Sequence, residues 1–339
     1  LTTANNNIGI GQGAGDAITT GEANIIIGSS AGSAITTDQY VTIVGYSSGQ
    51  YMEAGNGNRY NSYFGAVAGY RGGPGVSQTY LGANSGLYAT GSYNTFVGHD
   101  AGKGGTTSAP YSSGQYNTAV GYQALTAFTE PTYTTAIGYQ AGKAVTEGYD
   151  NTYIGARSGQ ANAVGDGNVT LGDRALYSDT SGHRTVAIGK DALYSFSGSG
   201  TTHYSSDITK IIAIGYHAAH GMGKVPGGSW PNATRSANNI VIGYHAAYTH
   251  YDGGANVIIG TEAVKGIGNH TQASVYIGES SGQNVASGSY NVAVGSYTGR
   301  FATGSYNTFV GSYAGVGGTT SAPYSSGQYN TALGYQALK

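Results

Sequence analysis

Histidine is the residue type whose spacing in this chain comes closest to a metal-binding pattern. Two YHAA segments place His217 and His245 at the same position of a repeated unit, with His220 and His250 close behind them. Imidazole nitrogens are common ligands of zinc and other transition metals. A surface metal site is therefore one interpretation. The alternative is a set of outward-facing polar residues produced by a recent duplication.

Other patterns that support catalysis are missing from the sequence. The chain has no cysteine, which excludes disulfides and thiolate-bound metals, and its 16 acidic residues do not cluster. No nucleophile elbow, phosphate loop or dinucleotide fingerprint lies between a strand and a helix. We therefore predict no catalytic, cofactor-binding or metal-binding residue, no cofactor and no enzymatic activity.

The composition narrows the class of partner. Of 339 residues, 60 are glycine and 31 are tyrosine, while 9% are charged and the net charge is −2. Nucleic-acid binding needs a basic surface, which so few lysines and arginines do not supply. Apolar runs are far shorter than the roughly 20 residues of a membrane span. We expect neither a nucleic-acid partner nor membrane insertion.

The elements that would position any site come from a repeat. Residues 89–125 recur almost unchanged at 302–338, and inside this block lies a unit of about 17 residues. The unit reads Asn, β-branched, variable, aliphatic, Gly, two variable residues, a small residue, then Gly or Leu. Its central glycines are Gly11, Gly28, Gly45, Gly65, Gly82, Gly98, Gly121, Gly138, Gly155, Gly172, Gly189, Gly215, Gly243, Gly260, Gly278, Gly295, Gly311 and Gly334.

A unit this short cannot bury a core alone and must stack on its neighbours. Frequent glycine disfavours helices. The repeat therefore predicts an all-β fold, a parallel β-solenoid or β-roll of 18 coils with loop insertions, forming a single array over residues 1–339. Because the chain starts without Met and ends just after a repeat, we interpret it as a fragment of a longer fibre chain.

Alternation along each short strand predicts which residues share a face. The residues one and three before the central glycine are restricted in type, so we expect them to face inward. The residue between them varies, which predicts an outward position for Tyr63, Tyr80, Tyr153 and Tyr276. Three after the glycine stands only Ala, Ser or Thr, which indicates a tight interior corner. The glycine itself is expected to have a positive φ or to make room for a neighbour.

Asparagine stands four residues before the glycine in 12 of the 18 copies. Stacked coils bring like residues about 4.8 Å apart, so we predict a structural ladder of amide-to-amide hydrogen bonds; ligand binding is the alternative. The ladder residues are Asn7, Asn24, Asn61, Asn94, Asn117, Asn151, Asn168, Asn239, Asn256, Asn291, Asn307 and Asn330.

Tyrosine also recurs directly after the central glycine. An exposed aromatic face either packs against a neighbouring chain or stacks on sugars, and both interpretations stay open. These residues are Tyr46, Tyr122, Tyr139, Tyr216, Tyr244 and Tyr335.

Five insertions follow the small corner. Loops on a rigid solenoid often carry recognition, so we predict a candidate binding loop with Trp230, His203 and Tyr204. Ordinary loop decoration is the alternative. The insertions span residues 50–60, 103–116, 194–210, 220–238 and 316–329.

Units such as NTAVGYQAL (117–125) and NTFVGHDAG (94–102) resemble the Asn-Thr-Ala-Ile-Gly-Tyr-x-Ala repeats of phage tail-fibre-like and related bacterial surface fibre proteins. They are similar, more distantly, to the β-roll head repeats of trimeric autotransporter adhesins. The resemblance covers essentially the whole chain. It implies a β-roll fibre, often trimeric, located extracellularly on a virion or cell surface.

The sequence supports three interpretations of the function. The first is a non-enzymatic extracellular fibre segment, a rigid shaft displaying loops for adhesion or for binding a receptor or surface glycan. The second is a structural filament or sheath whose function is polymerisation. In both, the chain's partner is itself, as a trimer or a filament. The third is an ice-binding solenoid, which we set aside because the strand position expected to face outward is too mixed to form a regular threonine array.

Overall fold

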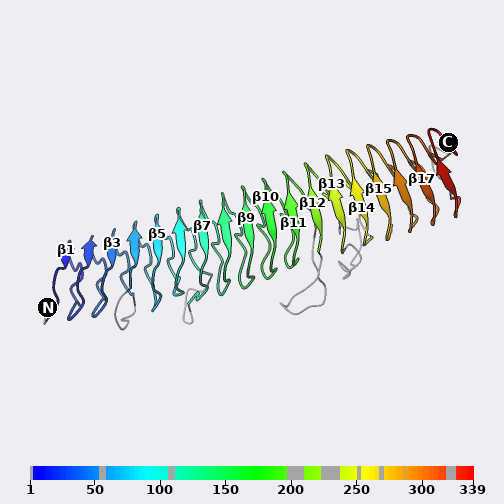
Figure 1. Cartoon of the computed structure of the whole chain (residues 1–339). Coiled ribbons are helices and arrows are strands. Elements are labelled where there is room, and N and C mark those ends of the chain that lie inside the picture. Colours follow the sequence, from blue (N-terminus) through cyan, green and yellow to red (C-terminus); the bar gives the residue numbers. More distant parts are fainter. Residues whose placement is uncertain are drawn as a thin grey trace. The chain divides into compact units, whose positions relative to one another are not determined.

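The structure, a computed structural model, consists of short strands joined by turns. It divides into two compact units, Leu1–Val164 and Gly165–Lys339. The described residues contain no helix (Figure 1). The predicted all-β parallel β-solenoid is therefore confirmed, whereas the single uninterrupted array stays a prediction. The described residues are 3–52, 59–105, 111–196, 210–222, 237–249, 253–266, 271–285, 287–317 and 326–339.

Each strand has three residues and ends directly before a central glycine. Among its described residues, unit 1 contains β1 (Ile8–Ile10), β2 (Ile25–Ile27), β3 (Thr42–Val44), β4 (Ser62–Phe64), β5 (Thr79–Leu81), β6 (Thr95–Val97), β7 (Thr118–Val120), β8 (Thr135–Ile137) and β9 (Thr152–Ile154). The described part of unit 2 contains β10 (Val169–Leu171), β11 (Val186–Ile188), β12 (Ile212–Ile214), β13 (Ile240–Ile242), β14 (Val257–Ile259), β15 (Val275–Ile277), β16 (Val292–Val294), β17 (Thr308–Val310) and β18 (Thr331–Leu333).

Within each unit, successive strands pair in parallel and in register. Thr118 pairs with Thr135, and Val120 pairs with Ile137, so each residue lies beside its equivalent in the next coil. The same register joins β13 to β14 in unit 2. Insertions between repeats do not shift it, because the strand residues of coils separated by longer intervals still pair, as β6 and β7 do. The fold therefore arranges equivalent side chains in columns.

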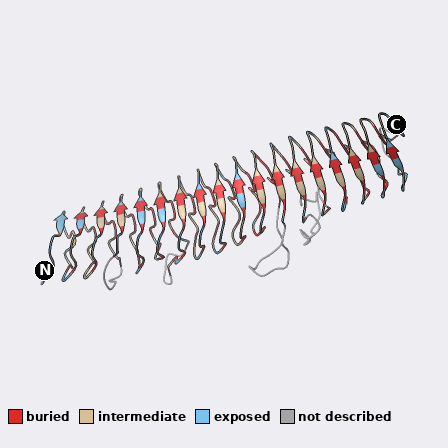
Figure 2. Ribbon diagram, in the orientation of Figure 1, coloured by how far each residue is buried: buried red, intermediate tan, exposed pale blue. Residues whose placement is uncertain are grey.

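The burial of these columns reverses the predicted faces (Figure 2). From β2 to β18 the middle residue of every strand is buried, and the two outer residues are half-buried or exposed, as in Thr118–Val120. The prediction that Tyr63, Tyr80, Tyr153 and Tyr276 face outward is wrong, because all four lie in the core. Alternation shows that the first and third residues share a face, but it does not show which face is inside.

The central glycine meets both conditions that the repeat suggested. Gly121 has a φ of 130°, and a Cβ atom there would lie 2.5 Å from the carbonyl oxygen of Gly138 in the next coil. A side chain is therefore excluded by backbone strain and by contact with the neighbouring backbone. The predicted small interior corner is also confirmed, since Ala124, Ala192 and Thr298 are fully buried.

Core volume is shared between the middle strand residue and the residue four after the central glycine. Where the middle strand residue is aromatic, the residue four after the central glycine is itself a glycine. A Cβ atom on that glycine would collide with the aromatic ring. Coils with Ala or Thr in the middle of the strand often carry Leu there instead. The aromatic pairs are Tyr63/Gly69, Tyr80/Gly86, Phe96/Gly102, Tyr153/Gly159, Tyr276/Gly282 and Phe309/Gly315; the leucine pairs are Ala119/Leu125, Thr170/Leu176, Ala187/Leu193 and Ala332/Leu338.

Candidate functional site

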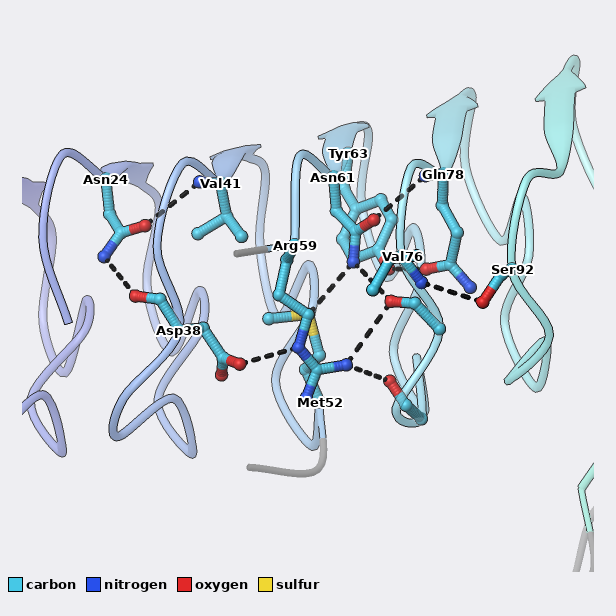
Figure 3. A network of polar contacts seen from close by, with 12 residues as sticks. Asn24, Asp38, Val41, Met52, Arg59, Asn61, Tyr63, Val76, Gln78 and Ser92 are labelled. Atoms are coloured by element: carbon cyan, nitrogen blue, oxygen red, sulfur yellow. Dashed lines mark hydrogen bonds and ion pairs between the residues drawn. The ribbon is translucent and has the colours of Figure 1, made fainter. Parts of the chain in front are cut away.

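The repeated asparagines clamp each coil to the next. The Oδ1 atom of Asn117 accepts a 3.0 Å hydrogen bond from the Thr134 amide, and its Nδ2 atom donates to the Pro131 carbonyl at 2.8 Å. Asn24 bonds Val41 and Asp38 in the same way (Figure 3). Both bonds reach the backbone of the following coil. The oxygen and the nitrogen of the side-chain amide therefore both help to fix the register between successive coils.

This geometry differs from the predicted amide-to-amide ladder. Direct amide-to-amide bonds join Asn256 to Asn239 at 3.1 Å and Asn330 to Asn307 at 3.0 Å. The clamp to the next backbone is the more frequent contact. Both of its bonds are made by Asn7, Asn24, Asn61, Asn94, Asn117, Asn168, Asn239, Asn256, Asn291 and Asn307.

Replacing Asn117 with Ala is expected to destabilise the stack by about 2–4 kcal/mol. The substitution leaves the Thr134 amide and the Pro131 carbonyl without their partners in a buried position, at roughly 1–3 kcal/mol for each group. Hydrogen exchange of the amides in β7 and β8 measures the loss of protection. Gln115→Ala is the control, because Gln115 is an exposed amide in the same coil. Equal exchange in the two variants would contradict the clamp.

A buried ion pair adds a second link between coils, which the sequence analysis missed. Arg59 and Asp38 are both almost fully buried, and Arg59 Nε lies 2.6 Å from Asp38 Oδ1 (Figure 3). The Arg59 guanidinium also donates to the Gly73 carbonyl at 2.7 Å. The contacts therefore span three successive coils. Neither residue belongs to the repeated pattern, so the repeat carries no signal for them.

The outward sheet face of unit 2 is entirely aliphatic over seven coils. The first and third residues of β10 to β16 are Val, Ile or Leu in every strand, and they are half-buried or exposed. Val169 and Leu171 are 42% and 47% exposed. We call this surface the aliphatic face. No charged side chain belongs to it.

The corresponding face of unit 1 has a different composition. From β3 to β9 the first strand residue is Ser or Thr, and the third is Val, Phe, Leu or Ile. Hydroxyl and apolar columns therefore run side by side along the coils. The contrast with unit 2 lies in the first column alone.

Exposed tyrosines form further columns, with their rings stacked on one another. Tyr116 lies between Tyr93 and Tyr133, with ring centroids 4.8 and 4.9 Å away and nearly parallel planes. Tyr122 and Tyr139, which the repeat placed outward, stack at 5.6 Å. Because the ring faces contact each other, the columns present mainly ring edges and hydroxyls to solvent. Sugars stack on open ring faces, so this packing does not favour the glycan interpretation.

Tyrosine at the repeat position of Tyr116 was not predicted to form stacks. The tyrosines at this position directly precede the position of the clamping asparagine, and they adopt φ values of 54–61°. The signal in the sequence was the recurring YN dipeptide. Its tyrosines are Tyr60, Tyr93, Tyr116, Tyr290, Tyr306 and Tyr329, with Tyr40 and Tyr133 at the same position in other repeats.

Unit 2 brings His217, His245 and His220 together. The rings of His217 and His245 stack at 5.2 Å, and those of His217 and His220 are 4.9 Å apart. His217 Nε2 lies 3.1 Å from Asp191 Oδ2. Burial, with smaller contributions from Lys265 and His217, lowers the pKa of His245.

This cluster resembles packed side chains more than an open ligand set. The Nδ1 atoms of His217 and His245 are buried and have no hydrogen-bond partner within the described structure. Across the described ranges, no group of three or more His, Cys, Asp or Glu side chains is arranged to hold a metal ion. His250 lies outside the described residues, as do Trp230, His203 and Tyr204 of the candidate binding loop.

The geometry defines a β-solenoid repeat protein whose notable surfaces are ordered columns. In the part of the chain that the structure describes, no helix has the length and apolar character to cross a membrane. Comparison with models of known protein families finds none that matches this chain, and comparison with curated proteins finds no similar sequence. The ordered columns are therefore the features from which a function can be inferred.

Proposed function

We propose that this chain is a non-enzymatic structural segment of an extracellular fibre, and that copies of it associate side by side through the aliphatic face of unit 2. The observation that carries the proposal is the composition of that face, which has Val, Ile or Leu at every outward position of seven consecutive strands. Soluble monomers seldom expose a continuous apolar surface of this kind.

A second copy is the partner that fits this surface best. Equivalent strands in a parallel stack repeat every 4.8 Å or so, and another coil stack has the same repeat. Copies related by a twofold axis present the same patch to each other, so the aliphatic face of one copy packs against the aliphatic face of the other. The face has no charge that needs a counter-charge on a different partner.

Among the readings of the sequence, this proposal favours assembly over adhesion. The aliphatic face offers a surface to a second copy, whereas the stacked tyrosine columns offer few open ring faces to a sugar. The extracellular location, on a virion or cell surface, is supported by the low charge and by the resemblance of the repeats to surface fibre proteins.

The expected result is that the chain is larger than a monomer in solution and that Val257→Lys shifts it toward the monomer. Val257 lies in β14, inside the aliphatic face, where a lysine would place a charge in the interface. Light scattering coupled to size-exclusion chromatography measures the mass. Thr261→Lys, four residues away at an exposed position off the face, is the control and should leave the mass unchanged. A wild-type chain that stays monomeric at high concentration would overturn the proposal.

A further inference from the structure

Five consecutive strands of unit 1 carry a regular array of threonines. Each strand from β5 to β9 has Thr as its first residue and a branched aliphatic residue as its third, and both point outward. Phe64 and Ser62 interrupt this pattern in β4. The threonine array consists of Thr79/Leu81, Thr95/Val97, Thr118/Val120, Thr135/Ile137 and Thr152/Ile154.

Four of the five hydroxyls of this array are available to water. Within the described residues, the side chains of Thr79, Thr95, Thr118 and Thr135 have no protein hydrogen-bond partner. The adjacent residue Thr134 shows the contrast, because it is buried and its hydroxyl donates to the Gly148 carbonyl. The hydroxyls of these four threonines must therefore bond to solvent, each beside its own methyl group.

The parallel register makes the array a two-dimensional lattice. Thr118 lies beside Thr135, and Val120 lies beside Ile137. The spacing is roughly 4.8 Å along the coils and roughly 6.6 Å between the two columns of one face. These two repeats are close to the spacings of water oxygens on the faces of ice.

We infer that the threonine array of unit 1 binds ice. Regularly spaced hydroxyls hold water, and the methyl and aliphatic groups between them favour a cage-like arrangement of that water, which can join the crystal lattice. The array contains no charged side chain that would impose a different hydration pattern. The mixed middle strand position, which argued against ice binding at the level of sequence, is buried, and the true outward position is regular.

Other occupants fit this array less well. A second copy packed on it would bury a column of hydroxyls, at roughly 1–3 kcal/mol for each one left without a partner. The aliphatic face of unit 2 has no such cost. A crystalline polysaccharide would need open aromatic ring faces, and the array contains no aromatic residue.

The test is the thermal hysteresis of the purified chain and its inhibition of ice recrystallisation. We expect wild-type protein to show both activities and Thr118→Lys, at the centre of the array, to lose most of each. Thr20→Lys is the matched control, because Thr20 is an exposed threonine outside the array, and it should behave as wild type. Circular dichroism of each variant confirms that the fold is retained.

Two outcomes would overturn the inference. One is a folded wild-type chain with neither activity, and the other is an equal loss in Thr118→Lys and Thr20→Lys. If Thr118→Lys instead converts an oligomer to a monomer, the occupant of the array is a second copy and the inference also fails. The assembly proposal is tested separately by Val257→Lys, so either can fail without the other.

Discussion

Replacing Gly121 with Ala is expected to separate the coils of β7 and β8 and to destabilise this part of unit 1 by about 4 kcal/mol or more. The φ of 130° is closed to residues with a Cβ atom, and strain of this kind costs roughly 1–3 kcal/mol. The new methyl group would also lie 2.5 Å from the Gly138 carbonyl oxygen. A backbone atom cannot rotate away, so the two coils must move apart and lose their hydrogen bonds.

Hydrogen exchange measures this effect where it occurs, since repeat proteins unfold in parts rather than as one unit. Loss of protection should centre on Thr118–Val120 and Thr135–Ile137. Gly334→Ala separates the two causes, because Gly334 has a φ of 119° but a Cβ atom there meets no other atom within 4 Å. It should show the strain alone. Equal losses in both variants would mean that the contact between coils contributes nothing.

The repeat predicted the fold because its constraints act on every coil. The positive φ of the central glycine, the small interior corner and the strand of three residues all follow from residue types that recur at one position. The inward face could not be deduced in the same way. Strand alternation has two solutions, and the assumption that the more uniform columns form the core leads to the wrong one for Tyr153.

The structure explains why the more uniform columns are the outer ones. An outer residue meets only its equivalent in the next coil, so a column of like β-branched residues satisfies the whole stack. A core residue meets side chains from its own coil as well, and Ala119 with Leu125 fills a space similar to that of Tyr153 with Gly159. Variation in the core is therefore paired variation, which a column-by-column reading of the sequence does not detect.

Residues outside the repeat were the least predictable. Arg59 and Asp38 form their buried pair across coils, and neither residue type recurs at the equivalent position of another repeat. The histidines were correctly expected to come close together, since His217 and His245 share a position in adjacent coils. The partial burial of both rings and the contact of His217 with Asp191 depend on neighbouring coils, which spacing along the chain does not describe.

The paired core predicts that one disruptive substitution rescues another. Gly282→Leu alone should destabilise unit 2 strongly, because a Cβ atom at this position already lies 2.6 Å from Cε1 of the buried Tyr276 ring. Tyr276→Ala alone leaves a cavity and should cost about 3–5 kcal/mol, as other truncations of large aromatic residues do. The two changes together recreate the Ala119/Leu125 arrangement and should recover part of the stability that the single substitutions lose.

Backbone strain does not prevent this rescue. Leu125, Leu176 and Leu193 occupy the equivalent position with φ values of 50–53°, and Gly282 has a φ of 62°. A double-mutant cycle measured by hydrogen exchange of the β15 amides gives the coupling energy, which should favour the double variant by about 2–3 kcal/mol, near the upper end for contacting residues. The reverse exchange, Ala187→Tyr with Leu193→Gly, is the matched control and should behave in the same way. If the effects of the single substitutions simply add, the two positions do not share one volume, and the variation of core residues along the coils needs a different physical cause.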